Sequence, residues 1–220
     1  NYRINSRRLQ RWYDDEQIIY VDDILTPEAL DAVYRICTER NDFHNVKPWG
    51  YLGAYLNDGF HHPTLLKIAS ELRRALPKIF DGHELMQLWA YKYSQDMEGI
   101  KMHGDDAAVN VNIWITPNDA NKDPNSGGLV VYRRFPPDEW GYKTFNHYSN
   151  EAKLEKYFKD DAVTIPHRQN RAVIFNSYLW HKTDRFSFKK GYPNRRINLT
   201  LLFGLRAKQQ KSRRISGGSK

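Results

Sequence analysis

The amino-acid sequence predicts a mostly β protein in which N-terminal helices pack outside a sandwich or jelly roll of short strands. Its 220 residues suit one domain with a full core, and 40% hydrophobic against 27% charged residues is typical of a soluble globular chain. Helical apolar periodicity is confined to the first third of the chain, and short β-branched and aromatic runs follow it. Because no helical pattern separates these runs, a sandwich or jelly roll is favoured over a parallel sheet.

Residues 1–84 are expected to form an N-terminal helical segment that packs on the strands. Thr26 is a good N-cap and Pro27 fits the first helical position, so one helix should begin there. A second helix should begin at Pro63 and stop before Pro77. Each helix carries one apolar stripe at helical spacing, formed by Leu30, Val33, Tyr34 and Cys37 in the first and by Leu65, Ile68, Ala69, Leu72 and Leu76 in the second.

Residues 85–205 should form the strand-rich core, interrupted by an insertion over residues 135–161. The expected strands are Leu85–Tyr93, Ala108–Ile115, Leu129–Tyr132, Arg171–Phe175 and Ile197–Phe203. The insertion is aromatic and charged, with a short helix expected over Asn150–Phe158. Residues 206–220 are predicted to be a basic, disordered tail because they contain too few apolar residues to fold.

Alternation along two of these strands predicts which side chains face the interior of the core. On the last strand, one face holds Ile197, Leu199, Leu201 and Phe203, and the other holds Arg196, Asn198 and Thr200. In the strand Ala108–Ile115, the same parity turns Val111, Ile113 and Ile115 outward and Asn110, Asn112 and Trp114 inward. The apolar faces should pack against the helices. A polar interior suits a small charged ligand, and Arg196 buried there needs a carboxylate partner.

Charge and cysteine content limit the partners and the compartment. The formal net charge is +8, but ten of the 34 basic residues lie in residues 1–11 and 206–220, which contain no acid, so residues 12–205 hold 24 basic against 26 acidic residues. Basic tails on a near-neutral body disfavour a nucleic-acid partner. No apolar run approaches the ~20 residues of a membrane span, and no secretory signal opens the chain. Cys37 is the single cysteine, which excludes an intramolecular disulfide and makes a reducing, cytoplasmic location the expectation.

A candidate metal site is formed by His103, Asp105 and His181. His103-Gly104-Asp105 follows a strand, and His181 comes 78 residues later, just beyond the strand Arg171–Phe175. Two imidazoles and one carboxylate can occupy one face of an octahedral metal and leave three positions open, which is the arrangement that non-haem Fe(II) oxygenases use.

In these motifs the chain resembles the 2-oxoglutarate-dependent Fe(II) dioxygenases, in particular their prolyl-hydroxylase-like and phytanoyl-hydroxylase-like branches. The resemblance spans residues 85–204 and rests on Tyr93, His103-x-Asp105, Gly127–Tyr132, Arg171–Asn176 leading to His181, and Arg196–Thr200. It implies a double-stranded β-helix, the cupin-like jelly roll. It also implies Fe(II) held by His103, Asp105 and His181, and 2-oxoglutarate held by Arg196. By the same resemblance Tyr93 and Asn112 stand at positions that contact the co-substrate, and dioxygen is the second co-substrate.

The function that follows is an oxygenase that hydroxylates or desaturates a small polar, peptide or sugar substrate and releases succinate and CO2. Asp105 separates the chain from the related halogenases, which have a small residue there. Three alternatives stay open: a nucleic-acid demethylase of the same superfamily, a cupin-type metal enzyme with three histidines, and a non-enzymatic jelly-roll binding module. Leu202 stands where the demethylases carry a second arginine, which counts against the first alternative. Substrate identity and oligomeric state are not predicted.

Overall fold

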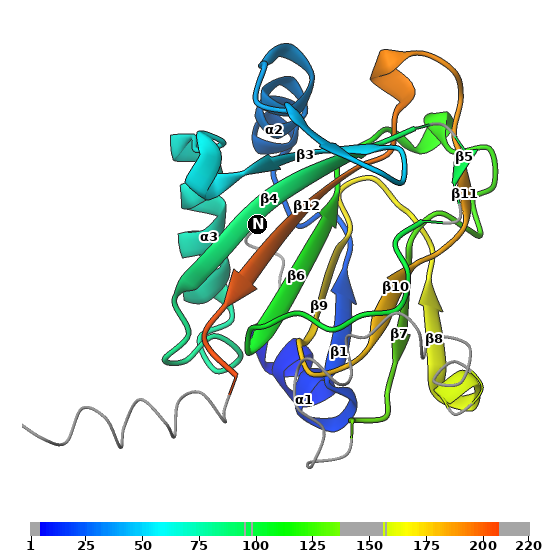
Figure 1. The fold of residues 1–220 in the computed structure, drawn as a ribbon. Helices are drawn as coiled ribbons and strands as arrows, with labels where there is room; N and C mark the ends of the chain where they lie inside the picture. Colours follow the sequence, from blue (N-terminus) through cyan, green and yellow to red (C-terminus); the bar gives the residue numbers. More distant parts are fainter. Residues whose placement is uncertain (1–4, 95, 98, 137–155, 157, 207–220) are drawn as a thin grey trace, which may run out of the picture.

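The computed structural model describes residues 5–94, 96–97, 99–136, 156 and 158–206. They form a larger and a smaller antiparallel sheet and a two-stranded pair, with helices against the larger sheet (Figure 1). The larger sheet has the spatial order β1 (Ile18–Val21), β9 (Ala172–Asn176), β6 (Val109–Trp114), β12 (Ile197–Phe203), β4 (Leu85–Tyr93), β3 (Tyr51–Tyr55) and β2 (Asn45–Lys47). The smaller sheet has the order β10 (His181–Thr183), β7 (Leu129–Tyr132) and β8 (Ala162–Ile165), and β11 (Phe186–Ser187) pairs with β5 (Asp96–Met97).

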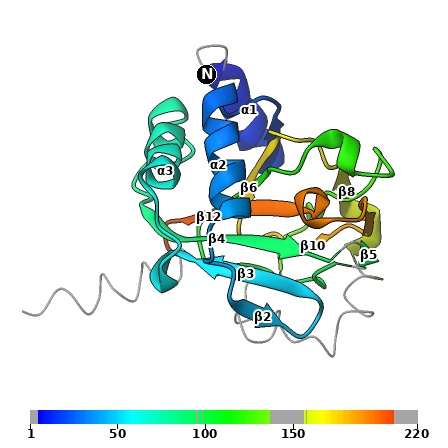
Figure 2. The same cartoon turned by 90° about the horizontal axis from the view of Figure 1, so that it is seen from above.

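Three α-helices lie on one side of the larger sheet (Figure 2). They are α1 (Ser6–Glu16), α2 (Pro27–Glu39) and α3 (Pro63–Ala75), and short 3-10 turns cover Leu56–Asp58, Asn118–Ala120, Lys159–Asp161 and Tyr192–Asn194. The expected start of α2 is confirmed, because the Thr26 hydroxyl accepts a hydrogen bond from the Ala29 N–H at 3.3 Å. The second helix also begins at Pro63 and ends before Pro77, as expected. None of the helices in the described residues has the length and apolarity of a membrane span.

The two largest apolar cores of the described residues hold these layers together. The larger core lies between the helices and the outer face of the larger sheet, and it joins Val33 and Leu65 to Ile113 and Leu199. The second lies between the two sheets and includes Trp114, Val131 and Phe175. Since burial of apolar area is the main driving force for folding, the outer core anchors the larger sheet as a rigid platform.

The alternation expected along β6 and β12 is confirmed. Leu199 pairs with Ile113 and packs toward the helices, whereas Thr200 pairs with Asn112 and faces the other sheet. Arg196 lies just before β12 on the same inner face as Asn198 and is only 2% exposed. The larger sheet therefore has an apolar outer face, and its inner face carries a row of polar side chains along β6 and β12 beside the second apolar core.

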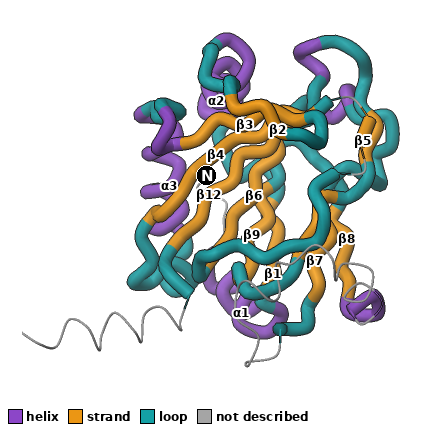
Figure 3. The backbone as a smooth tube through the Cα atoms, in the orientation of Figure 1, coloured by secondary structure: helices purple, strands orange, loops and turns teal. Residues whose placement is uncertain are grey.

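Residues 1–84 differ from the expected helical segment, because strands alternate with the helices there (Figure 3). β1, β2 and β3 all belong to the larger sheet, and β1 pairs antiparallel with β9. These strands are three to five residues long, which is too short for alternation to identify them in the sequence.

Part of each basic end belongs to the described fold, although Arg7, Arg8 and Arg11 are exposed on α1. Residues 6–11 belong to α1, which the Asn5 side chain caps by accepting from the Arg8 N–H at 3.0 Å. Arg206 is 8% exposed, with its guanidinium 4.3 Å from the centre of the Tyr178 ring. The remainder of the expected tail and most of the expected helix Asn150–Phe158 lie outside the described residues.

Candidate active site

The two histidines of the proposed metal site are direct cross-strand partners. The His103 N–H donates to the His181 carbonyl at 3.0 Å, and the His181 N–H donates to the His103 carbonyl at 2.9 Å. Residues that exchange both backbone hydrogen bonds in an antiparallel pair project their side chains to the same side. The two imidazole rings accordingly lie 4.3 Å apart between centroids.

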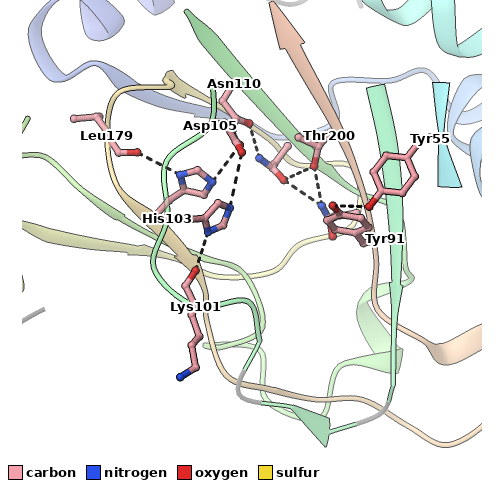
Figure 4. Close-up of polar contacts among 11 residues, drawn as sticks. Tyr55, Tyr91, Lys101, His103, Asp105, Asn110, Leu179 and Thr200 are labelled. Atoms are coloured by element: carbon pink, nitrogen blue, oxygen red, sulfur yellow. Dashed lines mark hydrogen bonds and ion pairs between the residues drawn. The ribbon is translucent and has the colours of Figure 1, made fainter. Parts of the chain in front are cut away.

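Asp105 lies two residues beyond His103 and faces both rings (Figure 4). Its Oδ1 is 4.0 Å from Nε2 of His103, and its Oδ2 is 3.4 Å from Nε2 of His181. Candidate ligand atoms from all three residues fall within 4.8 Å of one another. Sequence reasoning brought these three residues together as a metal site, and the structure places them side by side.

Backbone carbonyls orient both rings through the nitrogen that faces away from Asp105. Nδ1 of His103 is 2.7 Å from the Lys101 carbonyl, and Nδ1 of His181 is 3.3 Å from the Leu179 carbonyl (Figure 4). A carbonyl only accepts, so it selects the tautomer with a proton on Nδ1 and a lone pair on Nε2. This arrangement is common behind metal-binding histidines.

The carboxylate of Asp105 is favoured in its ionised form. Burial raises the pKa of Asp105, but the hydrogen bond and charge of His181, the charge of His103 and the Asn110 amide outweigh it, so that the pKa lies below its usual value. The Asn110 Nδ2 donates to Oδ2 at 2.5 Å. A charged, oriented carboxylate beside two imidazoles is a suitable donor set for a divalent cation, which binds the imidazoles in their neutral form.

Arg196 is buried on the same inner face without a carboxylate partner. Its Nε donates to the Gly127 carbonyl at 2.7 Å, and its two terminal nitrogens donate to Gly128 O at 3.1 Å and Asn198 Oδ1 at 3.2 Å. Among the described residues, no Asp or Glu forms an ion pair with it. Burial lowers the pKa of Arg196, yet a guanidinium stays protonated in proteins. The carboxylate that the sequence analysis required is therefore not supplied by the described part of the chain.

A chain of side-chain amides connects Arg196 to Asp105. Arg196 donates to Asn198, the Asn198 Nδ2 donates to Asn112 Oδ1 at 3.2 Å, and the Asn112 Nδ2 donates to Asn110 Oδ1 at 2.7 Å. Asn110 then donates to Asp105 (Figure 4). An arginine only donates and an ionised carboxylate only accepts, so the orientation of all three amides is fixed by the two ends.

Two hydroxyl groups complete the inner face. The Thr200 hydroxyl donates to Asn112 Oδ1 at 3.0 Å and accepts from Asn198. Tyr93 is 1% exposed, and the guanidinium carbon of Arg196 lies 4.7 Å from the centre of its ring. Burial raises the pKa of Tyr93, although the charge of Arg196 and the Thr183 hydrogen bond oppose this shift, so the phenol stays protonated at neutral pH.

Similarity to known proteins is found at the level of structure. No family model and no curated protein matches the sequence. Among solved structures, HygX from Streptomyces hygroscopicus with nickel and 2-oxoglutarate bound has a TM-score of 0.61 at 14% identity, over 91% of this chain and 87% of HygX. The α-ketoglutarate-dependent carbocyclase SnoK from nogalamycin biosynthesis has a TM-score of 0.67 at 12% identity, over 92% of this chain and 84% of SnoK. A prolyl-4-hydroxylase from Pseudomonas putida has a TM-score of 0.61 at 15% identity, over 92% of this chain and 100% of that chain.

The chain has the fold of these 2-oxoglutarate-dependent enzymes. The expected jelly-roll core with N-terminal helices is thereby confirmed. Within this fold, the metal candidates lie on the smaller sheet and the segment paired with it, while Arg196, Asn112 and Tyr93 belong to the larger sheet or its end.

Two residues beside the candidate site, Asn110 and His167, were not identified as site residues from the sequence. Parity had turned Asn110 inward, but no sequence signal indicated that it would contact Asp105. His167 lies outside every strand that the sequence predicts, yet the structure buries it to 5% exposure near Arg196. A loop position has no periodicity, so its burial could not be predicted from the sequence.

Proposed function

We propose that this protein is an Fe(II)- and 2-oxoglutarate-dependent oxygenase that hydroxylates or desaturates a small substrate and releases succinate and CO2. The observation that carries this proposal is the presence, on one polar interior, of a three-ligand cluster and a buried arginine without a carboxylate. The three-ligand cluster can hold a divalent cation and the buried arginine can hold an organic anion, and the proposed reaction requires both.

The donor set supports iron as the metal. His103, Asp105 and His181 offer two neutral nitrogens and one charged oxygen from the same side, and the carbonyls behind the rings direct both Nε2 lone pairs toward the shared position. Such a set occupies one face of an octahedron and leaves room for further ligands. A third histidine, which the three-histidine alternative requires, is not part of the cluster among the described residues.

Arg196 supports a dicarboxylic co-substrate. Three neutral acceptors hold the guanidinium in a fixed orientation, but they leave its positive charge uncompensated in a buried position. A carboxylate arriving beside it restores neutrality and gains strong hydrogen bonds. The rigid anchoring of Arg196 also fixes where the anion lies relative to Asp105, through the amide chain between them.

In the proposed reaction, the chain binds and orients groups rather than exchanging protons with them. Bound Fe(II), with 2-oxoglutarate and dioxygen, would supply the oxidant that attacks a substrate C–H bond. His103, Asp105 and His181 would hold the metal, and Arg196 would hold the distal carboxylate of the co-substrate. Tyr93, which stays protonated, could donate a hydrogen bond to that carboxylate without altering its charge. The apolar core between the sheets limits the access of water to this interior.

Aromatic side chains of β3 and β4 support a small ring-containing substrate. Tyr55 and Tyr91 lie beside the amide chain with their hydroxyls 3.1 Å apart, and the Trp89 ring is 5.9 Å from Tyr91 (Figure 4). Flat amphipathic rings suit sugars and other cyclic metabolites. Two structures of similar fold contain such ligands: HygX with hygromycin B and the epimerase SnoN with nogalamycin RO. A small molecule is therefore favoured over a nucleic acid.

Metal and co-substrate binding test the proposal directly. Anaerobic titration should show about one Fe(II) per chain, and added 2-oxoglutarate should then produce a metal-to-ligand charge-transfer band. His181→Ala should lose most of the iron affinity. His44→Ala is the matched control, because His44 pairs with Asp58 at 2.9 Å but belongs to no three-ligand cluster, so it should bind iron normally.

Equal iron affinity in His181→Ala and the parent would overturn the assignment of the ligands. Iron binding without any response to 2-oxoglutarate would favour the binding module over the oxygenase. An enzyme of the proposed class should also form succinate in aerobic incubations, and His181→Ala should form none. A binding module would form no succinate in either protein.

A further inference from the structure

His167 is a buried histidine whose ring has no hydrogen-bond partner in the described residues. It follows β8, is 5% exposed, and both Nδ1 and Nε2 lack a partner. Buried polar groups in folded proteins are nearly always paired, so each exception calls for an explanation. The oxygenase chemistry proposed above has so far given His167 no role.

The backbone holds His167 against the two glycines that anchor Arg196. The His167 N–H donates to the Ser126 carbonyl at 3.2 Å, and the next two residues, Gly127 and Gly128, accept from the Arg196 guanidinium. A Cβ on Gly128 would come within 2.8 Å of the His167 nitrogen, so the two segments are in direct contact. Only a glycine permits this approach, which fixes the position of His167 relative to Arg196.

Aromatic rings close the same cluster from the side of β11. The His167 ring lies 5.2 Å from Phe188, Phe188 lies 5.8 Å from Phe186, and Phe186 lies 5.3 Å from the guanidinium carbon of Arg196. Trp114 contacts the His167 ring from β6 at 5.9 Å. An imidazole and a guanidinium, both without a carboxylate, therefore share one aromatic enclosure.

The charges around His167 are predominantly positive. Burial, together with the charges of Arg196 and Arg171, lowers the pKa of His167 to about 3, so the ring is neutral at physiological pH. Arg171 is already paired, because its Nε and one terminal nitrogen donate to Asp22 at 2.5 and 3.0 Å. Asp184 acts on Arg196 from a distance, while its Oδ2 accepts from the Gly127 N–H at 3.2 Å. Arg196 therefore has no carboxylate in direct contact among the described residues, and Asp184 offsets its charge only from a distance.

We propose that His167 is a second anchor for the distal carboxylate of the co-substrate, beside Arg196, and that it binds a proton when this carboxylate arrives. This inference rests on the proposed function. A neutral imidazole can donate one hydrogen bond to the carboxylate, and the new negative charge stabilises the imidazolium form. No covalent bond changes: one proton moves from solvent to the ring as the anion binds.

The sign of the resulting pH dependence follows from linkage. In the free protein the ring is neutral above about pH 3, whereas in the complex its pKa is higher, so protons are taken up on binding between these two values. Affinity for 2-oxoglutarate therefore rises as pH falls, by up to about tenfold per pH unit where uptake is complete. A site that uses arginine alone has no such dependence, because arginine does not titrate.

Calorimetry of co-substrate binding tests this inference without turnover. The protein, saturated with Mn(II) so that the metal-site histidines do not titrate, is titrated with 2-oxoglutarate at about pH 6 in buffers of different ionisation enthalpy. The parent should take up a measurable fraction of a proton, up to about one half, because an adjacent opposite charge raises a pKa by about 1–3 units. His167→Gln, which can donate but cannot become charged, should take up almost none. His83→Gln should behave as the parent, because His83 is also partly buried with an unpartnered Nδ1 but contacts Gly204, at the opposite end of β12.

A second ligand isolates the distal carboxylate. 2-Oxopentanoate has the same carbon chain without that group, so its binding to the parent should show no proton uptake through His167. This comparison uses the parent protein alone and so decides the matter even if His167→Gln does not fold. Equal uptake with both ligands, or equal uptake in parent and His167→Gln, overturns the role of His167 and leaves the proposed function intact. Failure of the Mn(II)-loaded parent to bind 2-oxoglutarate overturns both.

Discussion

The two faces of the larger sheet differ in chemistry although the same strands build them. On β12, Leu199 and Leu201 point outward and are completely buried against the helices. Asn198 and Thr200 alternate with them and point inward, where they bond to Asn112. Neighbouring residues in the chain therefore have different roles. Those on the outer face stabilise the fold, and those on the inner face form the surroundings of the candidate site.

The difference teaches how a small domain supports an uncompensated charge. Burying Arg196 without a carboxylate is unfavourable, and the polar side chains around it add little hydrophobic stabilisation. The continuous apolar core on the outer face offsets that cost and keeps the strands rigid. Substitutions on the two faces should accordingly separate stability from ligand binding.

Leu199→Ala should give the largest effect and should act on stability. Removing a fully buried leucine side chain from the outer face costs about 2–5 kcal/mol through lost burial and a cavity. Urea unfolding of the metal-free protein measures this loss. The folded fraction should still bind Mn(II) and 2-oxoglutarate as the parent does. A change in ligand affinity as large as the change in stability would show that the two faces are not separable.

Arg196→Lys should act on ligand binding instead. The substitution keeps the charge but loses the planar fork that bonds to Gly127 and Gly128 and faces the co-substrate. Disrupting the buried pair between residue 196 and the distal carboxylate of 2-oxoglutarate costs roughly 2 kcal/mol or more, so the affinity for 2-oxoglutarate should fall by more than about tenfold. Titration of the charge-transfer band of the anaerobic Fe(II) protein measures it.

Arg195→Lys is the matched control for Arg196. Arg195 is adjacent in sequence and partly exposed, and alternation along the strand turns it away from the interior, so its replacement should be nearly silent. Weaker co-substrate binding in Arg195→Lys with normal binding in Arg196→Lys would mean that the wrong arginine has been assigned. Iron binding should survive in both variants.

Much of this comparison could be predicted from the sequence, because alternation with period two is a local property. It assigned Arg196 and Asn112 to the inner face and Leu199 to the outer face before any contact was known. The spacing of His103 and Asp105, two residues apart, likewise puts them on one side of an extended segment. The fold class could also be predicted from local patterns, because the strands that carry Asn112 and Leu199 are long or strongly apolar.

Other features depend on contacts between distant segments and left no local signal. The strands β1 and β3 are short, and they become visible only through pairing with β9 and β4. His167 gains its position from the close approach of Gly128, which no pattern around residue 167 indicates. The direction of the amide chain is set by its two charged ends, which lie 91 residues apart in sequence at Asp105 and Arg196.

The smallest expected effect concerns the centre of the amide chain. Asn112→Leu keeps the size of the side chain but removes the link between Asn198 and Asn110, leaving their polar atoms with fewer partners. Stability should fall by about 1 kcal/mol. Asn110 then loses the contact that orients it toward Asp105, so Mn(II) affinity should also fall, by about three- to tenfold. This loss is smaller than the roughly 10- to 100-fold loss that is usual for a residue bonded directly to a metal-binding side chain.

Thr116→Val distinguishes this effect from a general loss of buried hydrogen bonds. The Thr116 hydroxyl is buried and donates to the Arg195 carbonyl at 2.7 Å, while accepting from the Ile197 N–H at 2.7 Å, but it has no connection to Asp105. Its replacement should lower stability about as much as Asn112→Leu does, with Mn(II) affinity unchanged. If both variants weaken Mn(II) binding equally, the chain acts only as packing. If Asn112→Leu alone weakens it, the inner face couples the arginine end of the site to the metal end through oriented amides, whereas the outer face affects the site only through folding.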